Sequence, residues 1–371
     1  APKIVAAAYR AGAHEVVLEW SDQQINKAFL THTSLERLAN VPEYDILKAN
    51  TLMANNASRI SLVSQDPDGL AGVDSTRLQT MTKANQKAFT SVREATMKDD
   101  ISWLVVAAAG QAWAEKVFPD LSGQAAVNRL WEEILKDVRI DDTSDAIDHW
   151  NHHIKKLQAK ADWLNQQNFK ALHYKNAKSD FTIGLAEGHI WEAAISQDKA
   201  GNIFIPNMPT EEVFTAPDNR HIDGHVAATM PLSYQGNLID NIALDFKDGR
   251  IIDATATRGE NVLKQLIETD DGSKSLGEVS LVPDPSPISQ SGILFYNTLF
   301  DENASDHLAI GAAYASNISD GKTASPESLA SRGWNISDVH VDFMIGSSDM
   351  MIDGITQDNH SVPVFRNGDW A

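Results

Sequence analysis

The stretch ISWLVVAAAGQAWAEKVF, residues 101–118, places a continuous apolar run before a glycine and a helical pattern. A short apolar run that contains β-branched residues and ends at Gly110 is typical of a buried strand. We expect the strand to cover residues 101–107 and a helix to follow it at AWAEKVF. A strand that leads through a glycine into a helix is half of a β-α-β unit, so this stretch predicts an α/β fold with parallel strands.

The residues on either side of this stretch continue the alternation. Apolar patterning predicts further strands at 16–20 and 60–63, and helices at 4–11, 74–97, 123–137 and 142–165. In the last of these helices, His149, His152 and His153 lie beside lysines, which predicts a solvated face. The first residues read as the middle of a helix and begin without Met, so we expect that residues preceding Ala1 have been lost.

The pattern changes near residue 170 to short strands and turns. The run LDFKDGRIIDA predicts a hairpin that turns at Lys247, Asp248 and Gly249, and helices are expected at 259–269 and 305–316. At roughly 150 residues per domain, 371 residues suggest two domains. We therefore predict an N-terminal α/β domain, 1–175, with a mostly parallel sheet flanked by helices, and a C-terminal mixed α+β catalytic domain, 176–371.

Composition excludes several classes of function. The chain has 31 Lys and Arg against 51 Asp and Glu, a net charge of −20, and nucleic-acid binding needs clustered basic residues. The same charge argues against an anionic membrane surface, and no apolar run reaches the length of about 18 residues that spans a bilayer. Cysteine is absent, which excludes disulfides, thiolate zinc sites and a cysteine nucleophile. We expect a cytoplasmic protein in which any metal is held by histidine and oxygen ligands.

Two segments of the second half place carboxylates beside predicted strands. In NMPTEEVFTAPD, residues 207–218, Glu211 and Glu212 are adjacent in a loop between two prolines. Such a pair is usually solvated, although loops at strand ends often bind ligands. In LGEVSLVP, residues 276–283, Glu278 begins an apolar strand. A carboxylate there is costly unless it faces solvent, is paired or binds a metal.

Two further segments near the C-terminus combine histidines with possible partners. NASDHLAIGAAY, residues 303–314, reads as a capped helix on which His307 and Tyr314 share a face, because seven residues make two turns. DVHVDFMIG, residues 338–346, reads as a strand on which His340 and Asp342 share a face. A His-x-Asp pair on one strand face suits a metal, but it also arises by chance, and a core tyrosine is the plainer interpretation of Tyr314.

Taken together, these segments resemble the metallo-aminopeptidases of the aminopeptidase T and aminopeptidase S type, over essentially the whole chain. The most specific stretches are NMPTEEVFTAPD, PLSYQGNLI, LGEVSLVP, FYNTLFDENASDHLAIGAAY and DVHVDFMIGS, which occur in the family's order and spacing. The resemblance implies a dinuclear enzyme that removes single residues from peptide N-termini. It implies a homodimer with enclosed active sites. It also implies that a segment precedes the equivalent of Ala1 in family members.

Carried over by position, the resemblance implies metal ligands at Glu212, Glu278, His307, His340 and Asp342. Tyr314 matches a family tyrosine that lies at the metals as ligand or catalytic group, and Glu211 is only the neighbour of a ligand. Carboxylates and imidazoles without thiolate suit two divalent ions, with zinc expected and cobalt or manganese as alternatives. Glu278 is the residue that we expect to bridge the ions or to accept the proton of the attacking water.

The function predicted from the sequence is therefore a metal-dependent aminopeptidase that acts on peptides with a free N-terminus through a metal-activated water. The nearest alternative is another dinuclear hydrolase, such as a dipeptidase. A third possibility is a metal-stabilised peptide-binding protein without turnover. Neither the preferred N-terminal side chain nor the native metal follows from any run in the sequence.

Overall fold

The predicted β-α-β unit lies at the centre of the N-terminal half of a computed structural model, which describes residues 1–142 and 145–371. β1 (Arg59–Val63) pairs in parallel with β2 (Trp103–Ala107), and β2 pairs in parallel with β8 (Asn207–Met208). The α/β class and the parallel sheet are thus confirmed. β2 is less buried than predicted, because only Ala107 of its five residues is fully buried.

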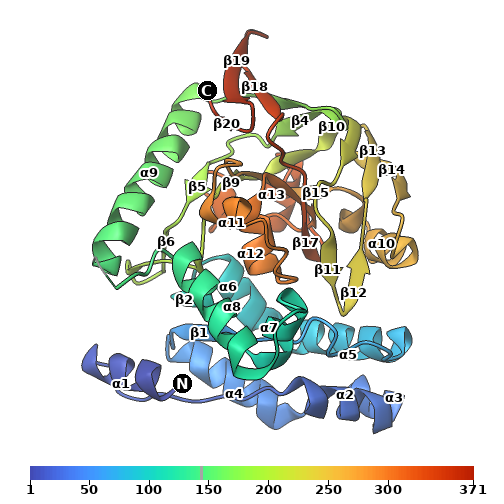
Figure 1. Cartoon of the computed structure of the whole chain (residues 1–371). Coiled ribbons are helices and arrows are strands. Elements are labelled where there is room, and N and C mark those ends of the chain that lie inside the picture. The colour runs from blue at the N-terminus through green and yellow to red at the C-terminus, as the bar shows by residue number, and fades with distance from the viewer. Residues whose placement is uncertain (143–144) are drawn as a thin grey trace.

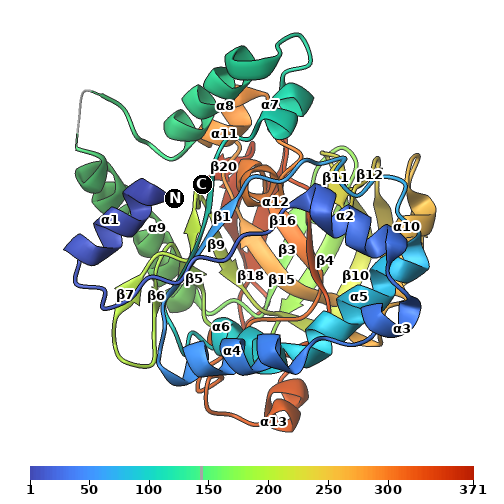
Figure 2. The ribbon, with the colours of Figure 1, turned by 90° about the horizontal axis from the view of Figure 1, so that it is seen from below.

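Nine helices lie in the N-terminal half of the described residues, and the last of them packs against β5 (Glu192–Ala193) and β9 (Val213–Thr215) of the second half. They are α1 (Pro2–Arg10), α2 (Gln23–His32), α3 (Leu35–Leu38), α4 (Glu43–Ala54), α5 (Ser75–Ala88), α6 (Thr90–Met97), α7 (Gln111–Val117), α8 (Gly123–Asp137) and α9 (Ala146–Gln167). In Figure 1 the first of these helices lie at the opposite end of the molecule from the C-terminal strands. Figure 2, seen from below, shows α2, α4 and α5 in front of the antiparallel sheets.

Three elements of this half differ from the predictions. Residues 16–20 form no strand; no neighbouring strand pairs with them, and Val17, Leu18 and Trp20 are exposed. The helix predicted at 74–97 is two helices, α5 and α6, which meet at Phe89. The helix predicted at 142–165 begins at Ala146 as α9, and residues 143 and 144 lie outside the described residues.

Two antiparallel sheets build most of the second half. One has the order β14-β13-β10-β4-β3-β18-β19-β20 and the other the order β17-β16-β15-β9-β5. The first contains β3 (Ala171–Lys175), β4 (Asp180–Leu185), β10 (Pro217–Ala227), β13 (Ala243–Lys247), β14 (Arg250–Thr255), β18 (Met351–Ile355), β19 (Ser361–Arg366) and β20 (Asp369–Trp370). The second contains β5 (Glu192–Ala193), β9 (Val213–Thr215), β15 (Leu276–Leu281), β16 (His307–Gly311) and β17 (His340–Met344).

Short elements connect these sheets. The strands are β6 (Ser196–Gln197), β7 (Ile203–Phe204), β11 (Leu232–Tyr234) and β12 (Asn237–Ile239); the helices are α10 (Glu260–Ile267), η1 (Gly272–Lys274), α11 (Pro287–Ser291), α12 (Thr298–Asp301), η2 (Glu302–Ala304), η3 (Ala315–Asn317) and α13 (Pro326–Ser331). The predicted hairpin is present as β13 and β14, with Asp248 and Gly249 at φ 48° and 80° in its turn. Positive φ at both positions is what a tight two-residue hairpin turn requires.

The two antiparallel sheets share one hydrophobic core. Ile183 and Leu244 of the eight-stranded sheet pack in the same buried cluster as Val279, Leu308 and Phe343 of the five-stranded sheet. The buried face of the five-stranded sheet is therefore apolar, and its other face is free to carry polar groups. Among the described residues no helix is both long and apolar enough to cross a membrane.

A second apolar cluster joins the halves of the chain. Trp113 of α7 and Leu130 of α8 pack with Phe295 and Phe300 from the C-terminal half, and the Trp113 indole donates to the Phe295 carbonyl at 2.6 Å. β8 likewise returns the chain to the N-terminal sheet after β3 has begun the eight-stranded one. The division at residue 175 stays a prediction.

The helix predicted over residues 305–316 is wrong. Residues His307–Gly311 form β16, the strand between β15 and β17. Alanine and glycine in this run are compatible with a helix or with a strand that other elements approach closely. Hydrogen-bonded pairing with β15 and β17 makes the segment a strand. The spacing of His307 and Tyr314 by two helical turns therefore does not exist.

Candidate metal centre

The five-stranded sheet carries polar side chains on the face away from the shared core. On β15, Glu278 lies opposite Ala309 of β16, and Ala309 lies opposite Asp342 of β17. His340 pairs in the same way with Gly311. Small residues on β16 thus separate the acidic and imidazole side chains of its neighbours, which leaves open space above the strand.

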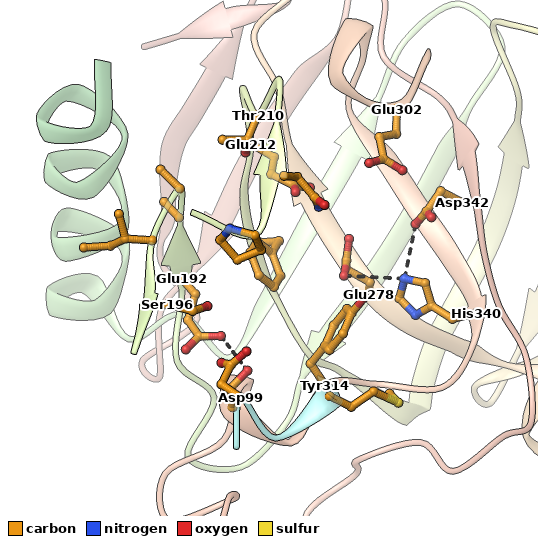
Figure 3. A pocket seen from close by; sticks show the side chains of 18 of the residues that line it. Asp99, Glu192, Ser196, Thr210, Glu212, Glu278, Glu302, Tyr314, His340 and Asp342 are labelled. Carbon is orange, nitrogen blue, oxygen red and sulfur yellow. Dashed lines mark hydrogen bonds and ion pairs between the residues drawn. The ribbon is translucent and has the colours of Figure 1, made fainter. Parts of the chain in front are cut away.

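Two groups of three side chains meet on this face. His307 Nε2 lies 3.1 Å from Glu212 Oε2 and 3.4 Å from Glu278 Oε1. His340 Nε2 lies 3.7 Å from Glu278 Oε2 and 3.5 Å from Asp342 Oδ1. Each group offers three ligand atoms within 4.8 Å of one another, and Glu278 belongs to both. Figure 3 shows Glu278 between Glu212 and His340.

Backbone and hydroxyl groups fix the orientation of these side chains. His307 Nδ1 lies 3.0 Å from the Ser305 carbonyl, and His340 Nδ1 lies 2.7 Å from the Ala312 carbonyl. A ring that donates from Nδ1 to a carbonyl presents the lone pair of Nε2 to the cluster, which is the form that binds metals. The Ser280 hydroxyl donates to Glu212 Oε2 at 2.8 Å.

The charges of the cluster are strongly coupled. Burial opposes an imidazolium at His307, but Glu212 and Glu278 outweigh it and raise the pKa of His307 well above its ordinary value. Burial likewise opposes the charge on His340, while Asp342 and Glu278 raise its pKa to about 10. Burial raises the pKa of Glu278, and the hydrogen bond with His307 opposes that rise.

This donor set fits divalent cations. Three buried carboxylates exceed two imidazoles in charge, and a buried carboxylate is costly unless it is paired or binds a metal. Asp342 Oδ1 is buried and accepts no hydrogen bond from the described residues. Oxygen and imidazole ligands suit zinc, cobalt or manganese.

Tyr314 reaches the same cavity from the segment that follows β16. Its ring centroid lies 5.1 Å from that of His340 and 6.2 Å from that of Phe214. Burial, followed by the charge of Glu278, raises the pKa of Tyr314 well above its ordinary value, so the phenol is protonated at neutral pH. The tyrosine thus lines the cavity with the candidate ligands, although not through a shared helix face.

Comparison with known proteins shows the family of the chain. The family model described as "Thermophilic metalloprotease (M29)" matches residues 1–370. The chain belongs to the M29 metallopeptidase family. This M29 protein is 50% identical over 369 residues to "Aminopeptidase PepS" of Streptococcus thermophilus, with 99% of this chain and 89% of the relative covered. It is 49% identical to "Aminopeptidase AmpS" of Bacillus subtilis, with 99% of this chain and 90% of that relative covered.

A solved structure extends the comparison to the fold. "Wild-type AmpT from Thermus thermophilus" superposes with a TM-score of 0.91 at 37% identity, covering 99% of this chain and 90% of that one. The predicted family and fold are thereby confirmed. This M29 protein is a metal-dependent aminopeptidase, a hydrolase that acts on peptide bonds.

The glutamate pair is buried rather than solvated, and its two members face different partners. Both Glu211 and Glu212 are less than a tenth exposed. Glu212 joins the candidate ligands, whereas the carboxylate of Glu211 is held by both terminal nitrogens of Arg139, with Nη2 to Oε2 at 2.8 Å. His153 packs against the same pair, with Nε2 2.7 Å from the Thr210 carbonyl. The solvated face predicted for His153 is therefore wrong.

Several side chains of the cavity escaped the sequence analysis. Glu302, in the turn before β16, belongs to neither group of three but lines the same cavity near Asp342 (Figure 3). Glu192 lies at its other end. The sequence offers a weak signal for Glu302, because it falls inside the quoted FYNTLFDENASDHL stretch. Nothing local marks Glu192, because only strand pairing brings it to the site.

Proposed function

We propose that this M29 aminopeptidase uses two divalent metal ions, with zinc as the expected metal and cobalt or manganese as alternatives. Glu212, Glu278 and His307 would hold one ion, and Glu278, His340 and Asp342 the other. The observation that supports this assignment best is the shared carboxylate. Glu278 directs one oxygen toward His307 and the other toward His340.

When bound, such a metal pair lowers the pKa of a coordinated water toward neutrality and polarises the scissile carbonyl. Side chains of the protein would perform the remaining steps. Glu278 lies between the groups, where it can accept a proton or orient the nucleophile. Tyr314 is protonated at neutral pH and would donate a hydrogen bond to the carbonyl oxygen as negative charge develops there. Glu302 lines the cavity outside both groups, where a carboxyl oxygen could accept a hydrogen bond from the substrate's free α-ammonium. Burial, followed by the charge of Asp342, raises the pKa of Glu302 well above its ordinary value.

The test is hydrolysis of a dipeptide and of one tripeptide in two forms, with a free and with an acetylated N-terminus, before and after chelation. We expect cleavage of the free form alone, loss of cleavage after chelation, and recovery when zinc, cobalt or manganese is returned. Cleavage of dipeptides only would indicate a dipeptidase instead. Tripeptide binding without turnover in the metal-loaded protein would indicate a binding protein.

We also propose a cytoplasmic homodimer. Support for the dimer comes from large apolar side chains exposed on the N-terminal segment, among them Trp20 at 81%, Ile25 at 69% and Leu47 at 65% exposure. A gathering of exposed apolar groups often marks a protein interface. Light scattering after size exclusion should give twice the chain mass of 40.6 kDa. A mass of one chain at micromolar concentration would contradict the dimer.

A further inference from the structure

The cavity that contains the candidate metal ligands continues beyond them to Glu192. Its lining includes the metal cluster and Tyr314 at one end and Glu192 and Asp99 at the other, and the Trp103 indole donates to Asp99. Figure 3 shows Glu192 and Asp99 together, away from His340 and Asp342. This far end contains none of the candidate metal ligands, so a substrate group that enters the cavity can reach it.

Sheet register fixes how far Glu192 lies from the metal cluster. Glu192 of β5 is paired with Phe214 of β9, and Phe214 is paired with Ser280 of β15. Ser280 is two residues from Glu278 and therefore shares its face of the sheet. β5 is two strands from β15, so the two glutamates are separated by roughly 10 Å across the sheet.

Glu192 keeps one oxygen available. Its Oε2 accepts hydrogen bonds from Ser316 Oγ at 2.7 Å and Asn317 Nδ2 at 3.1 Å. Within the described residues, Oε1 accepts none. Burial raises the pKa of Glu192 to about 6, against the hydrogen bond from Ser316, so the carboxylate is ionised at pH 8.

The neighbouring acid is already paired. Asp99 Oδ1 accepts from the Trp103 indole at 3.1 Å, and Oδ2 lies 3.0 Å from Lys322 Nζ. Lys322 therefore pairs directly with Asp99, while its influence on Glu192 is weaker than the effect of burial. The cavity lining includes the apolar side chains of Trp103 and Phe214, and the sheet register places Phe214 of β9 between Glu192 of β5 and Ser280 of β15. The far end of the cavity is thus an apolar passage that ends at a carboxylate.

We propose that Glu192 is a specificity-determining residue that receives the cationic side chain of an N-terminal lysine or arginine, an inference that rests on the proposed function. With the scissile carbonyl at the metal cluster, the first side chain of the peptide enters the passage. Lysine and arginine carry their charge at the end of an apolar stem, which matches apolar walls that lead to a carboxylate. A charge-assisted hydrogen bond to Oε1 would complete the contact.

The α-ammonium of the substrate does not fit the position beside Glu192. It is two bonds from the scissile carbonyl carbon, whereas Glu192 is roughly 10 Å from Glu278 across the sheet. Glu302 lies much nearer to the candidate ligands, beside Asp342 (Figure 3). A contact with the α-ammonium would also be common to all substrates, whereas one with the side chain distinguishes among them.

The experiment compares wild type, Glu192→Gln and the control Glu187→Gln, which changes an exposed glutamate on the preceding loop. Initial rates at pH 8 with metal-loaded protein give kcat/KM for lysyl, arginyl, leucyl and methionyl anilides. Glutamine can still accept from Ser316, so the fold should persist, and thermal unfolding and metal content verify this. We expect kcat/KM for the lysyl and arginyl substrates to fall about 10- to 100-fold in Glu192→Gln alone. The leucyl and methionyl values should stay within about twofold.

A second measurement tests the subsite without turnover. Calorimetry gives the affinities of lysine hydroxamate and leucine hydroxamate for the same three proteins. Only the affinity for lysine hydroxamate should fall in Glu192→Gln. If no anilide is hydrolysed, the proposed function fails while this comparison still tests the subsite. Equal losses for all ligands, unchanged values for lysine and arginine, or no binding of lysine hydroxamate to wild type would overturn the proposal.

Discussion

Glu278→Gln should prevent binding of both metal ions, because Glu278 is the one side chain common to the two groups of three. Glutamine is similar in size and keeps one oxygen, so the change removes charge rather than volume. Burial already raises the pKa of Glu278 in the metal-free protein. The metal-free variant should therefore unfold within a few degrees of the metal-free wild type.

The expected rise in Tm follows from the linkage between metal binding and folding. A metal present at 100 times its dissociation constant stabilises the folded protein by about 2.7 kcal/mol for each site. At about 2 °C per kcal/mol for a large domain, two sites raise Tm by about 10 °C and one site by about 5 °C. The wild type should show the larger shift, Glu278→Gln almost none, and Glu212→Gln or Asp342→Asn about half.

The assay is thermal unfolding with and without zinc, together with metal content by mass spectrometry after gel filtration. The ratio of the zinc-induced Tm shifts between variants and wild type is the decisive quantity, because it depends on whether the two sites share a ligand. A full shift in Glu278→Gln, or two retained ions, would refute the bridging position. A loss in Asp342→Asn as complete as that in Glu278→Gln would show that the two groups do not bind independently.

Three further outcomes are expected. Tyr314→Phe should lower kcat by about 10²- to 10³-fold with metal content unchanged, since only a hydrogen-bond donor is lost; wild-type kcat would make the tyrosine structural. Glu211→Gln should keep both metals but lower the free energy of unfolding by about 1–3 kcal/mol in urea titrations, because Arg139 loses its charged partner; loss of metal would show that Glu211, not Glu212, is the ligand. Burial, followed by the charge of Glu133, raises the pKa of Asp137 to about 7, so the folded protein holds this proton more tightly than the unfolded chain and loses stability from this group as pH rises from about 4 to 7. Asp137→Asn should therefore raise Tm at pH 8 and change it little at pH 4, and an equal change at both values would contradict this account.

The candidate ligands were predictable wherever their neighbours followed a local pattern. His340 and Asp342 alternate with apolar residues, and the alternation predicts both the strand and the shared face. For His307 the local signal misleads, because alanine and glycine fit a helix until β15 and β17 are known to flank the segment. The family resemblance pointed to His307 and Tyr314, and the structure brings both to one cavity through sheet pairing rather than through a shared helix face.

The residues that sequence patterns missed depend on contacts between distant segments. Glu192 reaches the cavity only because β5 pairs with β9, and no neighbour in sequence marks it. His153 looked solvated among lysines, yet its helix turns this side chain toward Thr210 and Glu211. The fold class was easier to predict, because a strand, a glycine and a helix follow one another within the single stretch of residues 101–118.

The distribution of the proposed ligands over separate strands has a consequence for the chain during its synthesis. The proposed set extends from Glu212 to Asp342, and β17, which carries the last two ligands, comes after every other strand of the five-stranded sheet in chain order. Chains emerge from the ribosome N-terminus first. A nascent copy therefore holds only a partial ligand set until β17 has been made. We expect the hydrolase to be inert until that strand joins the sheet, which would protect the termini of other growing chains nearby.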